Sequence, residues 1–212
     1  MLPSTPTPCI AIPRTVDENW IRLSPLLELD LGCARGNFLV QMATLFPDRQ
    51  FLGVERLNDR VLRTQKKIDS QHLVNAQVVQ GKILETLENQ LPTASATWLH
   101  ILFPDPWPKR SHSSRRLIQP DAFPQFARVL KPNGHIRFLT DDENYWRETL
   151  KILPHLTDWE VEATDPVGDW PKTQFQKRFE DQGLPIYGWI LKKLSAFQGA
   201  PSSAKNESTF NN

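Results

Sequence analysis

The chain has 212 residues, 39% of them hydrophobic, and a formal net charge of +1. This length and composition fit one globular domain with a substantial core, and no apolar run approaches the roughly 18 residues of a membrane span. The small net charge excludes a protein that coats nucleic acid indiscriminately, so a nucleic-acid partner has to meet a local patch of positive charge.

The start of the chain and the cysteines limit location and chemistry. The first residues lack the basic start and apolar core of a signal peptide, so we expect a cytoplasmic protein with no membrane partner. Cys9 and Cys33 are the only cysteines, and their placement supports neither a disulfide framework nor a zinc site. We therefore expect reduced thiols and no metal.

Composition divides the chain into three parts. Residues 1–20 are rich in Pro and Thr, and residues 198–212 are rich in Ser, Asn and Gly. These compositions predict a flexible N-terminal arm and a disordered C-terminal tail. Residues 21–197 form the single predicted domain.

The predicted domain alternates strands with helices. Apolar patterns predict seven strands, at residues 26–31, 50–54, 76–79, 97–102, 135–139, 159–163 and 186–191. They predict five helices, at residues 37–45, 56–70, 83–91, 121–130 and 142–153. This α/β alternation predicts a doubly wound, mainly parallel seven-stranded sheet with helices on both faces and ligands at the carboxyl ends of the strands.

One segment of the domain, residues 165–185, fits no regular pattern. It is interrupted at four positions, Pro166, Gly168, Pro171 and Gly183. We therefore expect this segment to be irregular and mobile in the free protein, and strong protection of its amides from exchange would contradict that.

The loop after the first strand runs Asp30-Leu31-Gly32-Cys33-Ala34-Arg35-Gly36 and opens the first of these helices. Its glycines allow a ligand to approach the backbone closely. Their separation by three residues is not the G-x-G-x-x-G spacing of a dinucleotide site, and Asp30 suits a cationic ligand better than a phosphate.

This loop resembles the first motif of class I S-adenosylmethionine-dependent methyltransferases, (E/D)-x-G-x-G-x-G. Asp30, Gly32 and Gly36 are in register, and Ala34 stands where a middle glycine is usual. The resemblance implies a Rossmann-like fold with S-adenosyl-L-methionine as cofactor. The added methyl group of Ala34 is expected to be tolerated where the backbone keeps a negative φ.

The same resemblance implies two further cofactor contacts. Glu55 ends the second strand, where an acidic side chain accepts hydrogen bonds from both ribose hydroxyls. The adenine contact falls on Gln80-Gly81-Lys82, either through Lys82, by its backbone or side chain, or through Gln80.

A stiff acidic loop, Phe103-Pro104-Asp105-Pro106-Trp107-Pro108-Lys109, follows the fourth strand. The prolines on both sides of Asp105 hold its carboxylate in one direction, which suggests positioning for chemistry. With Arg115-Arg116-Leu117, this loop resembles the signature of the bacterial tRNA (guanine-N7)-methyltransferase family, F-P-D-P-W-x-K-x-R-H-x-K-R-R.

Two more marks of that family follow, Thr140-Asp141 and Thr173-Gln174-Phe175-Gln176-Lys177-Arg178, the latter similar to T-x-F-E-x-R. The resemblance spans roughly residues 26 to 192. Departures from the family pattern occur at Ser111, Ser114, Gln176 and Phe179.

The resemblance implies methyl transfer from S-adenosylmethionine to N7 of a guanine in the tRNA variable loop, giving 7-methylguanosine and S-adenosylhomocysteine. N7 already has a free lone pair, so alignment and charge stabilisation matter more than a strong general base. Asp105 is implied as the key active-site residue, which orients either the guanine edge or the amino group of the cofactor.

The resemblance also implies tRNA contacts at Lys109, Asp141, Thr173, Phe175, Gln176 and Arg178. Lys109 would pair with phosphate, Asp141 would accept from guanine N1–H or N2–H, and Phe175 would stack on a base or pack in the core.

Aromatic and basic neighbours leave alternatives open. Trp107 is either a stacking platform or structural support. Arg115, Arg116 and Arg178 are expected to contact phosphate, with plain surface charge as the alternative for Arg115 and an internal ion pair for Arg178.

The expected protein is a monomer or homodimer that binds tRNA and requires no protein partner. One alternative is a methyltransferase for another base or amine, against which Lys109 and the motif at Thr173 argue. The other is a catalytically silent RNA-binding subunit, which Ala34, Lys82 and Gln176 make conceivable. The joint presence of Asp30, Gly36, Glu55 and Asp105 favours an active enzyme.

Overall fold

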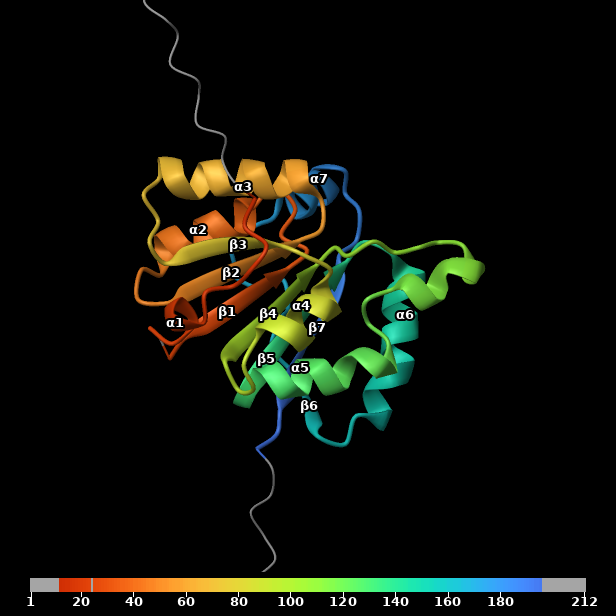
Figure 1. The fold of residues 1–212 in the computed structure, drawn as a ribbon. Coiled ribbons are helices and arrows are strands. Elements are labelled where there is room, and N and C mark those ends of the chain that lie inside the picture. Colours follow the sequence, from red (N-terminus) through yellow and green to blue (C-terminus); the bar gives the residue numbers. More distant parts are fainter. Residues whose placement is uncertain (1–11, 24, 196–212) are drawn as a thin grey trace, which may run out of the picture.

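The computed structural model describes residues 12–23 and 25–195 and has a single seven-stranded sheet at its centre (Figure 1). The strands are β1 (Leu27–Leu31), β2 (Gln50–Glu55), β3 (Ala76–Gln80), β4 (Ala96–Leu102), β5 (Leu130–Thr140), β6 (Trp159–Glu162) and β7 (Tyr187–Lys193). Their order is β3-β2-β1-β4-β5-β7-β6, and only β7 runs antiparallel to its two neighbours. The predicted doubly wound, mainly parallel seven-stranded sheet is confirmed.

Helices cover both faces of this sheet (Figure 1). They are α1 (Glu18–Ile21), α2 (Asn37–Leu45), α3 (Asn58–Ser70), α4 (Ile83–Gln90), α5 (Phe123–Val129), α6 (Glu143–Ile152) and α7 (Gln174–Asp181). Apolar side chains of α2 and α3, such as Phe38 and Ile68, pack in one core cluster. Those of α4, α5 and α6, such as Leu87, Phe126 and Tyr145, pack in the other, so two cores sandwich the sheet.

The order of strands places the first and fourth loops together. The chain leaves β1 toward β2 and β3 and then crosses back to β4 on the other side of β1. A crevice therefore opens at the carboxyl ends of β1 and β4, where the strand order reverses. The glycine loop and the loop that carries Asp105 both start at this crevice.

Three segments differ from the sequence prediction. Helix α7 forms inside residues 165–185, where no regular structure was expected, because Thr173 caps its first turn by accepting a hydrogen bond from the backbone N–H of Gln176. The fifth strand begins at Leu130 rather than residue 135, and the turn at Asn133 (φ 61°) interrupts its pairing with β4. Mobility of residues 165–185 stays a prediction.

The third difference lies near the N-terminus. Residues 12–20, expected in a flexible arm, lie against the domain: Pro13 accepts a hydrogen bond from Gln80 N, and Trp20 is buried in α1. Residues 1–11 of the expected arm and the expected tail at 198–212 lie outside the described residues. No helix within the described ranges is long and apolar enough to cross a membrane.

Candidate functional site

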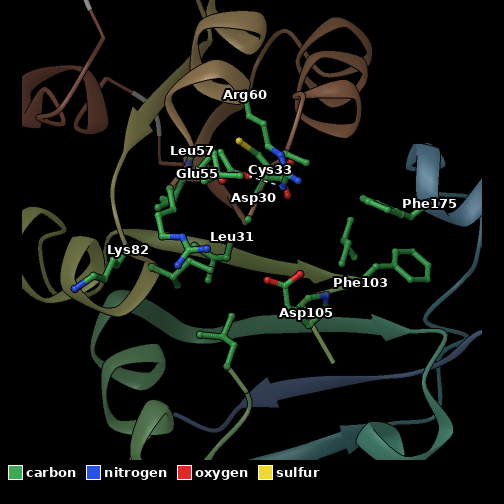
Figure 2. Close-up of a pocket in the computed structure, with 18 of the residues that line it drawn as sticks. Asp30, Leu31, Cys33, Glu55, Leu57, Arg60, Lys82, Phe103, Asp105 and Phe175 are labelled. Atoms are coloured by element: carbon green, nitrogen blue, oxygen red, sulfur yellow. Dashed lines mark hydrogen bonds and ion pairs between the residues drawn. The ribbon is translucent and has the colours of Figure 1, made fainter. Parts of the chain in front are cut away.

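A cavity of about 590 Å³ lies at the carboxyl ends of β1, β2 and β4 (Figure 2). Its size suits a small-molecule ligand. Seven of the residues predicted to bind cofactor or substrate line it: Asp30, Gly32, Glu55, Lys82, Asp105, Thr173 and Phe175. The other predicted residues, Gly36, Lys109, Asp141, Gln176 and Arg178, are not part of its lining.

The glycine loop is held against β2 by its backbone. Gly32 N and Cys33 N both donate to Val54 O, at 2.8 and 3.1 Å. Gly36 has φ 68°, and a Cβ there would lie 2.3 Å from the Thr64 side chain, so only glycine fits between α2 and α3. Gly36 therefore acts by packing behind the cavity.

Ala34 has φ 50°, so the negative φ under which its methyl group was expected to be tolerated is not present. The left-handed region is open to glycine and costs a residue with a Cβ about 1 kcal/mol or more. The loop thus keeps the backbone path that a middle glycine would favour, at some cost in stability.

The carboxylates of Asp30 and Glu55 share one wall of the cavity (Figure 2). Burial, together with the negative charge of Glu55, raises the pKa of Asp30 to about 7, and Arg137 opposes that rise. Glu55 Oε1 accepts from Leu57 N at 2.9 Å, and Oε2 lies 3.7 Å from Arg60 Nη1. A cationic group placed near Asp30 would favour its ionised form.

Lys82 lines the cavity at the start of α4, but its ammonium group pairs with Glu85 Oε1 at 2.6 Å. In Figure 2 its side chain extends away from Asp105 and Asp30. Gln80 is outside the cavity lining, and its side-chain amide donates to Arg56 O at 3.3 Å. The backbone at Lys82 is therefore the part best placed to face a ligand.

The loop that carries Asp105 has an unusual backbone. Phe103 (φ 54°) and Trp107 (φ 45°) are both left-handed, and neither is glycine. Phe103 N donates to Leu139 O at 2.8 Å, which ties the start of the loop to β5. Strain of this kind persists only where the surroundings hold it, and here it directs the exposed Asp105 carboxylate into the cavity (Figure 2).

Arg115 and Arg116 have different surroundings. Arg115 is exposed, with its guanidinium 5.0 Å from the centre of the Trp107 ring. Arg116 is 6% exposed, donates through Nε to Pro106 O at 2.6 Å and forms an ion pair with Glu148. Arg116 also lines the cavity, but its guanidinium is engaged by these partners and braces the Asp105 loop, so its contact with phosphate stays a prediction.

The start of α7 forms the opposite wall. Phe175 is 42% exposed and lines the cavity, so packing in the core is not its role. Phe179 lies behind it, with ring centres 6.2 Å from Phe175 and 5.4 Å from Phe103. Gln176 is fully buried and donates to Glu180 Oε1 at 3.1 Å, so it supports the helix from inside.

Besides Gln176, three predicted tRNA contacts lie outside the cavity lining. Lys109 is exposed at the end of the Asp105 loop, and Asp141 is half-buried just after β5. Arg178 is exposed, and within residues 12–23 and 25–195 it has no acidic partner, which removes the internal ion pair as its alternative.

Sequence reasoning missed three arginines at the cavity wall. Arg35, Arg56 and Arg60 line the cavity, and the first two are exposed. Arg35 lies in the glycine loop, Arg56 directly follows β2, and Arg60 lies four positions later in the first turn of α3. Two arginines four positions apart, directly after the acidic residue Glu55 at the end of a strand, were the sequence pattern that could have indicated them.

Comparisons with known proteins agree with each other. Residues 25–188 match the family described as "Putative methyltransferase". A tRNA (guanine-N(7)-)-methyltransferase of Neisseria meningitidis serogroup C is 32% identical over 87% of this chain and 78% of the relative. One of Burkholderia vietnamiensis is 35% identical over 79% of this chain and 67% of the relative. A solved SAM-dependent methyltransferase from Aquifex aeolicus has a TM-score of 0.56 at 15% identity, covering 81% of this chain and 84% of its own.

Proposed function

The chain belongs to the tRNA (guanine-N7)-methyltransferase family, and on that premise we propose that it methylates N7 of a guanine in the variable loop of tRNA with S-adenosylmethionine as cofactor. The observation that carries the proposal is a single cavity between the acidic wall of Asp30 and Glu55, the strained Asp105 loop and the exposed ring of Phe175. We propose residues 21–197 as the methyltransferase domain. A tRNA substrate implies a cytoplasmic enzyme, which we propose to be a monomer or homodimer with no required protein partner.

We call the part lined by Asp30, Gly32, Glu55 and Lys82 the cofactor half. Its residues fit S-adenosylmethionine. A buried carboxylate at Asp30 suits the cationic methionine end, and the fixed carboxylate of Glu55 suits the ribose hydroxyls. Gly32, with φ 88° and only one side-chain atom within 4 Å of a hypothetical Cβ, keeps the backbone open to the ligand.

We call the part formed by Asp105, Thr173 and Phe175 the substrate half. The chemistry that S-adenosylmethionine supplies when bound is a sulfonium methyl group open to displacement by a nucleophile. Guanine N7 has a free lone pair, so the protein needs no strong base and acts by alignment. Phe175 provides a stacking surface for the target base, and Asp105 orients that base or the amino group of the cofactor.

Charged residues stabilise the methylated base and bind the tRNA backbone. N7 methylation leaves a positive charge on the purine, and the Asp105 carboxylate stabilises that charge as it develops. Lys109, Arg115 and Arg178 are exposed and contact phosphates, while Asp141 accepts from the guanine edge. The wall arginines Arg35 and Arg56 extend the positive surface for the tRNA backbone.

The test is transfer of a radiolabelled methyl group to unmodified tRNA, followed by identification of the labelled nucleoside. We expect label in 7-methylguanosine and a loss of roughly 10²–10³ in rate for Asp105→Ala. Asp121→Ala is the control, because Asp121 is exposed and outside the cavity lining.

The alternatives give distinct outcomes. Label in another base, or in an added amine and not in tRNA, would identify a methyltransferase of different specificity. Binding of tRNA without any labelled product would identify a catalytically silent RNA-binding subunit. Either result would overturn the proposal.

A further inference from the structure

Arg137 carries a buried positive charge that has no role in the mechanism described above. It lies within β5, and its side chain is fully buried. The strand register places Arg137 beside His100 of β4, and His100 beside Asp30 of β1. Residues paired in this way point to the same face of a sheet. A row of ionisable side chains therefore crosses the sheet from the cavity to Arg137.

The guanidinium of Arg137 holds the segment that leads into α7. Its Nε donates to Pro166 O at 2.7 Å, and its Nη2 donates to Val167 O at 3.4 Å. Trp170 covers the same group, with the ring centre 4.8 Å from Cζ. Residues 163–173 contain no helix or strand, so these contacts tie an irregular segment to the sheet directly before Thr173.

The arrangement is costly for stability alone. Nη1 of Arg137 has no hydrogen-bond partner within the described chain. Burial lowers the pKa of Arg137 to about 10, although the carboxylates of Asp30 and Asp165 oppose that change. A well-packed apolar side chain is often as stabilising as a buried charge, so stability gives no reason for a guanidinium here.

Asp30 is surrounded by charges from several elements. Glu55 on β2 disfavours its ionised form, and Arg137 on β5 favours it. His100 on β4 has a pKa lowered by burial, although its contact with Glu28 Oε2 at 2.9 Å opposes this. The Cys33 thiol has a raised pKa, and Arg60 on α3 faces Glu55. Arg137 is thus a buried positive charge that partly opposes the rise in the pKa of Asp30.

We infer that Arg137 is a positioning residue for both halves of the cavity. Its contacts with Pro166, Val167 and Trp170 hold the start of α7 and hence the substrate half. Its charge favours ionised Asp30 in the cofactor half. The inference rests on the proposed function, because cofactor and tRNA are its two readouts. Because Arg137 holds Pro166, Val167 and Trp170, the mobility predicted for residues 165–185 in the free protein is confined to the residues after Trp170.

Two substitutions separate the two roles. Arg137→Lys keeps the charge but cannot donate in the same fork to two carbonyls. We expect KM for tRNA to rise roughly tenfold, with the pH midpoint of cofactor binding unchanged. Arg137→Met removes the charge as well, so the pH midpoint also moves upward from about 7, because Asp30 ionises less readily.

Arg128 offers a matched control. It also donates to backbone carbonyls, Leu87 O and Leu91 O, but from α5 on the other face of the sheet. Arg128 does not line the cavity, so the variants Arg128→Lys and Arg128→Met measure the effect of lost packing and hydrogen bonds alone. If the Arg137 variants match these controls in KM and in pH midpoint, the inference is wrong.

A third variant keeps the test decisive if Arg137→Met does not fold. Trp170→Leu removes the aromatic cover from the loop side and leaves the guanidinium in place. We expect a raised KM for tRNA, an unchanged pH midpoint and faster amide exchange across residues 165–170. An unchanged KM and exchange rate would overturn the positioning role. A wild-type chain that binds cofactor but does not methylate tRNA would instead overturn the proposed function.

Discussion

The cofactor half and the substrate half of the cavity are built from different kinds of structure. Asp30 and Glu55 end buried strands, and each is about 6% exposed. Asp105 and Phe175 come from an irregular loop and the first turn of a short helix, and both are exposed. In the proposed assignment, the small cofactor binds at the rigid edge of the sheet, and the large RNA binds to segments that can adapt their conformation.

The two halves of the cavity also differ in the burial of their charged groups. Asp30 in the cofactor half is buried, so its pKa responds to the neighbouring charges of Glu55 and Arg137. The basic groups of the substrate half divide into exposed residues such as Arg115 and a buried brace, Arg116. The predictions below test this division, beginning with the largest effect.

Arg116→Met should destabilise the protein while Arg115→Met should not. Removal of Arg116 leaves Pro106 O without its donor and uncovers Tyr145, whose ring centre lies 4.8 Å from the guanidinium, so we expect a loss of about 3 kcal/mol in unfolding free energy. Urea denaturation measures it. Arg115→Met should instead reduce the salt dependence of tRNA binding by about one phosphate contact. The reverse pattern would contradict the assignment of brace and phosphate contact.

Asp30→Asn should stabilise the free protein at high pH and weaken cofactor binding. The pKa of Asp30 in the folded protein is about 7, above its ordinary value of 3.8. Between about pH 4 and pH 7 the folded wild type therefore binds a proton that the unfolded chain does not, and it loses stability as the pH rises through this range. We expect the variant to be more stable by roughly 2 kcal/mol at pH 8 and similar to wild type at pH 4. A constant difference at both pH values in thermal denaturation would show that Asp30 does not titrate in this range.

Glu55→Gln should weaken cofactor affinity about tenfold and leave tRNA affinity unchanged. The amide keeps the shape of the side chain but loses the charge that strengthens hydrogen bonds to ribose hydroxyls. Titration calorimetry with S-adenosylmethionine measures this. Glu88→Gln, an exposed change on α4, is the control. Equal affinities in the two variants would remove Glu55 from the cofactor half.

Ala34→Gly should give the smallest effect, a gain of about 1 kcal/mol in stability. At φ 50° glycine relieves the cost of the Cβ, although its greater freedom in the unfolded chain offsets part of the gain. Asn133→Gly, also at a positive φ but in the turn within β5, is the matched control for the loop itself. A loss of stability in Ala34→Gly alone would mean that the alanine methyl group packs favourably in the loop.

Local signals predicted the cofactor half well. The helix at residues 37–45 was predicted at its observed bounds, because apolar periodicity and the preceding glycine act over a few residues. The seven strands were found at the correct places, with ends moved by one to five residues. All four residues of the cofactor half line the cavity. Each lies at the carboxyl end of a parallel strand or in the loop that follows it, and these ends meet at one edge of the sheet.

The sequence by itself determined the order of the elements, the sheet and the loops that meet at its switch point, since each depends on short-range pattern. Only the tertiary structure decided which basic groups are buried, because burial depends on partners far along the chain. Arg116 is paired with Glu148, 32 positions away, and Arg137 is tied to Pro166, 29 positions away. Long-range packing also decided that Arg137, and not a solvent-exposed residue, holds the segment before α7, through Pro166, Val167 and Trp170.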